Sequence, residues 1–275
     1  MHALRFILIA ISISMFAALG WRAVNPPRLP PRIEEPQPRI VIEPQIAPGA
    51  FDTPDGARGA VEDVIALDGD FEPYFSSLRD NFGSDYNALI DRFGRRAFDR
   101  KQTDSVDYYM SESIRALRHT RGLLAAQAEN SLLDRMFVMQ AAVIEALAVK
   151  DARLCADFIY GATSEGFFAF SESHRPLIAE MALANLAAII DGPSSKAVRL
   201  TPGDEEFQQL EEALTAAGLN QTEIDALVDG KAPDPPLPDE RMCAAGTAYL
   251  KVISALPEAT RVRLEALMVE LMART

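Results

Sequence analysis

The sequence contains few residues of the types that mark catalytic and metal-binding motifs. It has 2 cysteines and 3 histidines in 275 residues, and the histidines are far apart, at His2, His119 and His174. Patterns of the HExxH, GxSxG, SxxK, CxxC and phosphate-loop types do not occur. The sequence therefore predicts no cofactor and no metal site, and it disfavours the enzyme classes that depend on those motifs.

The missing motifs leave one class of enzyme open, because a carboxylate-dependent hydrolase can take its two acids from distant segments. Glu145 and Glu180 are the candidates, since each lies in a strongly apolar segment where burial would raise the pKa of a carboxyl group. Gln140 lies five residues from Glu145, and Asn185 lies five residues from Glu180. Five residues correspond to about 140° around a helix, so the two members of each pair do not share a face. The alternative interpretation is that both glutamates occupy helix edges and reach solvent or a basic partner such as Lys150.

Alternating strand-like runs bounded by turn residues are also missing from the chain after the first 54 residues. Nearly every later segment has apolar residues three and four apart, which is typical of amphipathic helices. About 220 residues are enough for one substantial core. The predicted fold is all-α, with a single bundle-like domain of about 8–10 helices over residues 55–275.

Most of the expected helices begin at a capping residue or a proline. Their ranges are 57–67, 73–82, a helix after Ser84, 104–128, 132–149, a helix after Asp151, 177–190, 201–218, 220–230, a helix after Asp239, and a last helix from Pro257. Residues 161–172 are predicted to be a loop that contains Phe167, Phe168 and Phe170. These rings either pack beneath the loop or form an exposed patch for a partner.

The first 24 residues are predicted to be a signal anchor or a signal peptide. Sixteen residues without charge, Phe6 to Trp21, follow Arg5, which is shorter than the roughly 20 residues that span a bilayer comfortably. Trp21 and Arg22 favour an uncleaved anchor at the membrane interface. The small residues that precede Trp21 equally permit cleavage.

Residues 25–54 are predicted to be a tether between this segment and the domain. Nine prolines occur in the 29 residues from Pro26 to Pro54. Each proline fixes φ and removes a backbone donor, so neither a helix nor a central strand forms here. A semi-rigid spacer of the polyproline type is expected.

The domain is acidic, with one local exception. Residues 49–275 carry 22 basic and 37 acidic side chains, which opposes approach to nucleic acid and to anionic lipid surfaces. We therefore expect no nucleic-acid partner, and membrane contact through the N-terminal segment alone. The exception is a basic cluster of Arg115, Arg118, His119 and Arg121, interpreted either as an anion site or as a solvated, salt-bridged face.

The two cysteines lie in matching hexapeptides, DARLCA around Cys155 and DERMCA around Cys243. An even number of cysteines in an exported chain favours a disulfide. The sequence therefore predicts a structural disulfide between Cys155 and Cys243, and two unpaired buried thiols are the alternative.

Three functions are compatible with these observations. The leading hypothesis is an envelope-associated helical binding or scaffold protein with protein partners in the cell envelope. The second is the exported hydrolase, and the third is a carrier that holds an apolar ligand in a dry cavity beside residues 132–149. The predicted location is the bacterial inner membrane with the domain in the periplasm; a cleaved protein would be soluble there or secreted.

Overall fold

The computed structural model describes residues 46–162, 164–231 and 233–274. The chain divides into two units, Met1–Pro30 and Pro31–Thr275, and the described residues all belong to the second. They form twelve α-helices and no strand, which confirms the all-α prediction. The predicted signal segment and the tether up to residue 45 lie outside the described residues.

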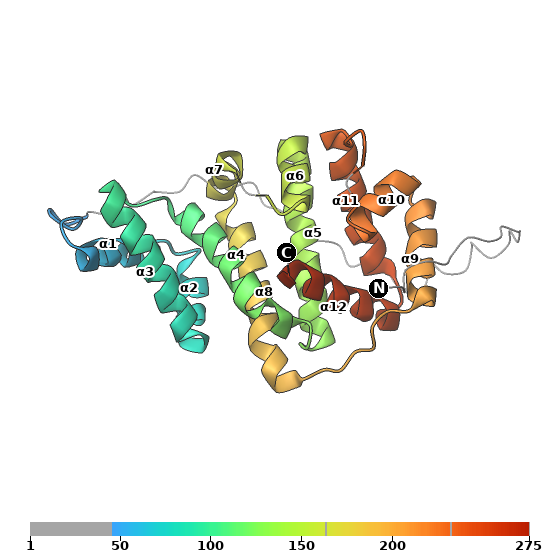
Figure 1. Cartoon of the computed structure of the whole chain (residues 1–275), viewed down its shortest axis with the longest axis horizontal. Coiled ribbons are helices and arrows are strands. Elements are labelled where there is room, and N and C mark those ends of the chain that lie inside the picture. The colour runs from blue at the N-terminus through green and yellow to red at the C-terminus, as the bar shows by residue number, and fades with distance from the viewer. Residues whose placement is uncertain (1–45, 163, 232, 275) are drawn as a thin grey trace, which may run out of the picture. The chain divides into compact units, whose positions relative to one another are not determined.

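The helices follow the chain in the order labelled in Figure 1. Their bounds are α1 Pro54–Ala66, α2 Glu72–Asn81, α3 Gly83–Arg100, α4 Val106–Ala125, α5 Asn130–Lys150, α6 Ala152–Ile159, α7 Glu165–Ser173, α8 Arg175–Ser195, α9 Asp204–Ala216, α10 Gln221–Val228, α11 Asp239–Ala255 and α12 Glu258–Arg274. The number exceeds the expected eight to ten, and of the three short helices α6, α7 and α10 only α7 lies in a segment that was predicted to be a loop.

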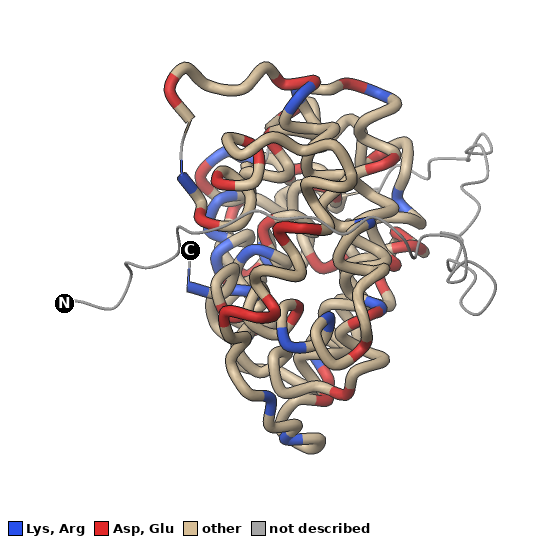
Figure 2. The backbone as a smooth tube through the Cα atoms, turned by 90° about the vertical axis from the view of Figure 1, so that its right-hand side faces the viewer, with Lys and Arg blue, Asp and Glu red and all other residues tan. Residues whose placement is uncertain are grey.

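Four helices form the centre of the domain. Helices α4, α5, α8 and α12 pack against one another, with α1–α3 on one side and α6, α9, α10 and α11 on the other (Figure 1). The side chains of α5 and α8 are buried around much of their circumference, as expected for the two most apolar segments. Acidic and basic residues are interspersed throughout the described chain (Figure 2).

Helices α4 and α8 run parallel and in register. At their N-terminal ends Arg175 pairs with Asp107. At their C-terminal ends Gly192 lies so close to Leu124 that a Cβ atom at this position would collide with the Leu124 carbonyl. The two contacts have the same sequence separation, 68 residues, so a residue of α8 is level with the residue of α4 that precedes it by 68.

The prediction of a loop over residues 161–172 is wrong for most of that range. Ser164 accepts a hydrogen bond from the Phe167 backbone N–H and caps α7. Phe167 and Phe170 are buried and Phe168 packs against the core. A short helix is difficult to recognise here because its apolar residues are contiguous and do not form a stripe.

At three helices the residue predicted to begin or cap the helix does not do so. Helix α3 begins at Gly83 without a side-chain cap, so Ser84 lies within it. Helix α9 begins at Asp204, because the Glu206 carboxylate accepts a hydrogen bond from the Gly203 N–H and sets the start after Pro202. Helix α11 begins at Asp239 itself. The capping box of Asn220 and Glu223 at α10 is confirmed.

Helices α6 and α11 are joined by the two cysteines. Cys155 and Cys243 lie at disulfide distance, with Cα atoms 5.4 Å apart, and are 88 positions apart in sequence. Closing a loop of this length stabilises the folded chain by about 4.5 kcal/mol in the chain-entropy model. The predicted pair is therefore brought together in the structure.

Within the described ranges, one helix, α8, is long and apolar enough to cross a membrane by length and composition. Half of its most apolar window is buried inside the domain, where it packs against α4 and α5. A buried core helix has the same composition as a spanning helix, so α8 is described here as part of the core.

Candidate functional site

A cavity of about 350 Å³ lies between α4 and α8. From α4 it is lined by one face of the helix, which includes Asp107, Ser111, Ile114, Arg118, Gly122 and Ala125. From α8 it is lined by Ile178, Met181, Ala182, Asn185, Leu186 and Ile189. These residues recur at spacings of three and four, so each helix presents a continuous stripe to the cavity.

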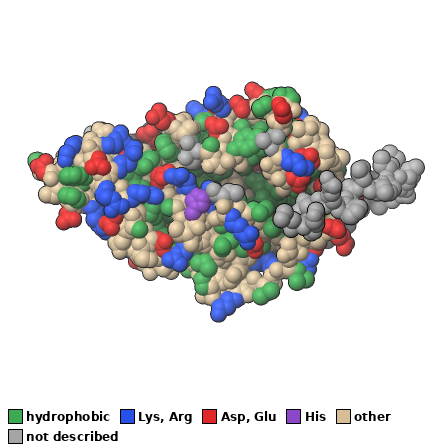
Figure 3. All heavy atoms as spheres, viewed as in Figure 1, with side chains coloured by type: hydrophobic (Ala, Val, Ile, Leu, Met, Phe, Trp, Pro, Cys, Tyr) green, Lys and Arg blue, Asp and Glu red, His purple; other side chains and the backbone are tan. Residues whose placement is uncertain are grey.

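The cavity follows most of the length of α4. The lining residues extend from Asp107 to Ala125, a rise of about 27 Å at 1.5 Å per residue. Helix α5, α12 and the segment from Phe158 to Ala162 contribute the remaining walls. On the face shown in Figure 3, hydrophobic side chains gather near the middle of the domain, with Lys and Arg side chains around them.

Two residues that line this apolar space each have a side-chain polar atom that is buried without a hydrogen-bond partner among the described residues. These atoms are the Tyr74 hydroxyl and the Arg118 Nε. Tyr74 is only 1% exposed, and its burial raises the pKa of the hydroxyl. Buried polar groups without partners are rare in folded proteins, and each one costs free energy of folding.

Arg118 is the more unusual of the two because it carries a charge. No carboxylate of the described residues lies within ion-pair distance of its guanidinium. Burial lowers the pKa of Arg118, and the positive charge of Arg115 lowers it further. Arg115 itself is exposed and donates a hydrogen bond of 2.6 Å to Glu112. A cation in this environment is a candidate ligand-binding group.

Two side-chain amides add hydrogen-bonding capacity. Gln140 of α5 and Asn185 of α8 line the cavity, and neither amide makes a hydrogen bond within the described part of the chain. From the register of the parallel helices, Asn185 is level with Leu117 and therefore next to Arg118 along the axis. Arg118 of α4, Gln140 of α5 and Asn185 of α8 thus bring polar groups with unsatisfied hydrogen-bonding capacity to one apolar space.

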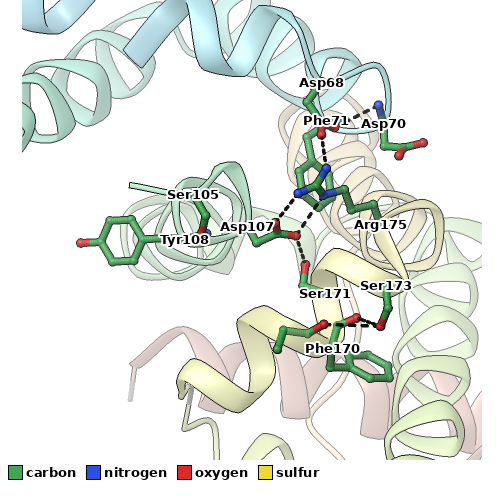
Figure 4. Close-up of polar contacts among 11 residues, drawn as sticks. Asp68, Asp70, Phe71, Ser105, Asp107, Tyr108, Phe170, Ser171, Ser173 and Arg175 are labelled. Atoms are coloured by element: carbon green, nitrogen blue, oxygen red, sulfur yellow. Dashed lines mark hydrogen bonds and ion pairs between the residues drawn. The ribbon is translucent and has the colours of Figure 1, made fainter. Parts of the chain in front are cut away.

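A second charged cluster lies at the N-terminal ends of α4 and α8 (Figure 4), and two of its members, Asp107 and Ser171, line the cavity. Arg175 donates to Asp107 over 2.7 Å and to Asp68 over 2.9 Å, and the Ser171 hydroxyl donates to Asp107 over 2.8 Å. Asp68 also accepts hydrogen bonds from the backbone N–H groups of Asp70 and Phe71. The carboxylates and the guanidinium of this cluster satisfy one another.

Glu145 and Glu180 are not brought together. Glu145 pairs with Lys251 of α11 over 2.8 Å, and Glu180 pairs with Arg135 of α5 over 3.0 Å. Neither residue lines the cavity. The structure thus places both glutamates at ion pairs outside the cavity, and the partner of Glu145 is Lys251 where Lys150 had been suggested.

A different carboxyl pair is buried between α5 and α12. Burial, together with the charge and hydrogen bond of Asp134, raises the pKa of Glu265 to about 8 against the opposing charges of Arg261 and Arg199. Arg261 donates two hydrogen bonds to Asp134, of 2.8 and 2.9 Å. Glu265 is outside the cavity lining, so we treat this pair as part of the core.

The basic cluster predicted from sequence separates into distinct environments. Arg121 pairs with Asp85 over 2.9 Å, and Arg115 pairs with Glu112. His119 is exposed. Arg118 alone of the four is partly buried and unpaired among the described residues. The salt-bridged interpretation therefore fits two members of the cluster, and the anion-site interpretation fits Arg118.

The sequence offered a signal for some of these groups and not for others. Gln140 and Asn185 are isolated polar residues in the two most apolar helices, and such residues often face a cavity or a partner. Tyr74 carried no signal, because an aromatic residue at helical spacing is usually core. Their convergence depends on how α2, α5 and α8 pack.

Over the described ranges, no group of three or more His, Cys, Asp or Glu side chains is positioned to hold a metal ion. Comparisons with protein-family models, with curated proteins and with solved structures found no match to this chain. The geometry of the cavity is therefore the basis for a functional proposal.

Proposed function

We propose that the helical domain binds a small amphipathic molecule in the cavity between α4 and α8. The observation that carries this proposal is the presence of two buried, unpartnered polar groups, Tyr74 and Arg118, in a space that is otherwise mainly apolar. Ligand pockets have this character: a mainly hydrophobic wall with a few polar groups that orient the ligand. Of the three functions compatible with the sequence, this supports the carrier.

The size of the cavity limits the ligand. At about 30 Å³ for each non-hydrogen atom, taking the volume per molecule of liquid water as a guide, a space of 350 Å³ holds roughly a dozen such atoms. The length along α4 favours an extended molecule over a compact one. A chain of about ten carbons with a polar end fits both constraints.

The sequence supports a location outside the cytoplasm for this binding domain. An apolar N-terminal run, a proline-rich tether and a cysteine pair at disulfide distance are all typical of exported proteins. We propose that the domain is displayed on a tether at the bacterial inner membrane and works in the periplasm, with envelope proteins as partners that deliver or receive its ligand.

The test uses a photoreactive ten-carbon alkyl diazirine with the full-length chain in lipid nanodiscs. Labelled peptides are mapped by mass spectrometry, and we expect them to come from α4 and α8. Ser111 lines the cavity, so Ser111→Leu places a larger apolar side chain in the space. We expect this substitution to reduce labelling at least fivefold, whereas His119→Leu, at an exposed position of α4, leaves it unchanged.

Stability measurements on a matched pair of variants test the cavity independently of the probe. Ser113 is fully buried in the packed side of α4, where its hydroxyl donates to the Tyr109 carbonyl over 2.7 Å. Ser113→Leu should lose about 1–3 kcal/mol through overpacking, while Ser111→Leu should stay within about 1 kcal/mol of the wild type. Labelling scattered over the surface, or wild-type labelling of Ser111→Leu, would refute the proposed function.

A further inference from the structure

We infer that the ligand of this cavity is an amphipathic carboxylate, an acyl chain of about ten carbons whose carboxylate is bound by Arg118 and Asn185. This inference rests on the proposed function and names the class of molecule bound. It is carried by one juxtaposition: a partly buried guanidinium with no anionic partner among the described residues, and a side-chain amide within one residue of its level on a parallel helix, with an apolar wall beyond them.

The charge balance of the cavity indicates an anion. Asp107 is the one carboxylate that lines it, and this group is already neutralised by Arg175. Arg115 is paired with Glu112, so Arg118 alone contributes positive charge to the lining without a carboxylate partner among the described residues, although the chain as a whole has a formal charge of −13. In an apolar space this charge is weakly screened, so it favours a bound anion.

The donor set matches a planar head with two oxygen atoms. A guanidinium presents paired N–H donors that fit both oxygens of a carboxylate. Asn185 supplies a further N–H from the opposite helix, level with Arg118. A neutral hydroxyl head would accept one of these hydrogen bonds and leave the charge of Arg118 uncompensated.

The wall beyond Arg118 accommodates the chain. Toward the C-terminal ends of the two helices the lining is apolar, and it consists of Gly122, Ala125, Leu186, Ile189, Val269 and Met272. From Arg118 to Ala125 the rise along α4 is about 10 Å. An extended chain of about ten carbons spans this distance, with its head at Arg118 and its end near α12.

The experiment compares decanoate with 1-decanol, which share a chain and differ in the head. Each competes with the neutral alkyl diazirine for the full-length chain in nanodiscs at pH 7.5. In the wild type we expect decanoate to compete at least tenfold more strongly than decanol. Arg118→Gln should reduce this ratio to near one by weakening decanoate alone. Arg95→Gln, at an exposed arginine of α3, should preserve the wild-type ratio.

The possible outcomes separate this inference from the proposed function. If the diazirine labels α4 and α8 but decanoate and decanol compete equally in the wild type, the cavity binds apolar molecules and the carboxylate inference is wrong. An unchanged ratio in Arg118→Gln also overturns it. Arg118→Lys keeps the charge and loses the paired donors, so it should retain a reduced preference for decanoate. This variant replaces Arg118→Gln in the test if the glutamine variant does not fold. If the diazirine does not label the cavity, the proposed function itself fails.

Discussion

Arg175 and Arg118 lie on two parallel helices that line the same cavity, and their surroundings are opposite. The side chain of Arg175 is 17% exposed and pairs with two carboxylates, Asp107 and Asp68. Arg118 is also partly buried, and the described residues offer it no anion. Burial by itself would lower the pKa of Arg175, but the hydrogen bond and charge of Asp107 together with the charges of Asp68 and Glu172 raise it overall. The pKa of Arg118 is lowered by burial and by Arg115.

The difference separates a structural role from a binding role. A buried cation stabilises a fold only when opposite charges and hydrogen bonds replace the water that it loses. Arg175 has these replacements, and it connects the segment before α2 to the starts of α4 and α8 (Figure 4). Arg118 lacks them among the described residues, and this is the observation behind the proposal that an anion binds there.

Removing the paired arginine should have the largest effect. In Arg175→Met the carboxylates of Asp107 and Asp68 stay buried without a counter-charge, and we expect a loss of about 3–5 kcal/mol in the free energy of unfolding. Urea denaturation followed by circular dichroism measures the loss.

Arg118→Met is the matched control. It makes the same substitution on α4, at an arginine that lines the cavity. We expect its free energy of unfolding to be unchanged or higher by up to about 1 kcal/mol, because an unpaired buried charge has been removed. Equal losses in the two variants would contradict the comparison and show that Arg118 has a structural role.

Glu265 provides an intermediate case, a buried carboxyl with only part of its hydrogen-bonding capacity used. Its folded pKa of about 8 is above its ordinary value of 4.5, so between these values the folded state holds one more proton than the unfolded state. Stability from this group should therefore decrease with rising pH across that window, by up to about 1.4 kcal/mol per pH unit. Above pH 8 this decrease ends.

Glu265→Gln removes the titrating group and keeps a donor toward Asp134. The free energy of unfolding of Glu265→Gln should not show the decrease with rising pH that comes from Glu265. At about pH 9 it should exceed the free energy of unfolding of the wild type. The control is Glu270→Gln, a substitution on the same helix at a carboxylate that is 44% exposed and pairs with Arg274. If both variants follow the wild-type pH profile, Glu265 is not protonated in the folded protein.

The smallest effects should come from two buried tyrosines. The Tyr74 hydroxyl has no partner among the described residues, whereas the Tyr109 hydroxyl accepts a hydrogen bond of 2.9 Å from the Asp104 N–H. Tyr74→Phe should raise the free energy of unfolding by about 0.5–1 kcal/mol, and Tyr109→Phe should lower it by about 1 kcal/mol. Thermal unfolding distinguishes these signs, and a loss in Tyr74→Phe would show that its hydroxyl is satisfied in solution.

Much of the fold follows from local patterns. The apolar spacing of α3, the cap of α6 at Asp151 and the capping box of α10 each identify a helix from a few neighbouring residues. Helix α7 was missed because its phenylalanines are contiguous, and its cap at Ser164 is a weaker signal. Local rules work for these helices because hydrogen bonds within a helix join residues close in sequence.

The candidate site follows from local patterns only in part. The sequence identified Arg118 as a member of a basic cluster, and it identified Gln140 and Asn185 as polar residues in apolar helices. It also directed attention to Glu145 and Glu180, which the structure places at ion pairs outside the cavity. A helix sequence states which residues share a face, and it does not state which other helix that face meets.

By itself, the sequence determined the all-α class, most helix positions and the acidic character of the domain, because composition and periodicity depend on residues that are near one another in the chain. Only the tertiary structure decided that Arg175 has two carboxylate partners and that Arg118 has none among the described residues. That outcome depends on the parallel register of α4 and α8, which is set by the close approach at Gly192 and the ion pair at Asp107. Contacts between residues 68 positions apart carry no signal in a local pattern, and the cavity exists because of them.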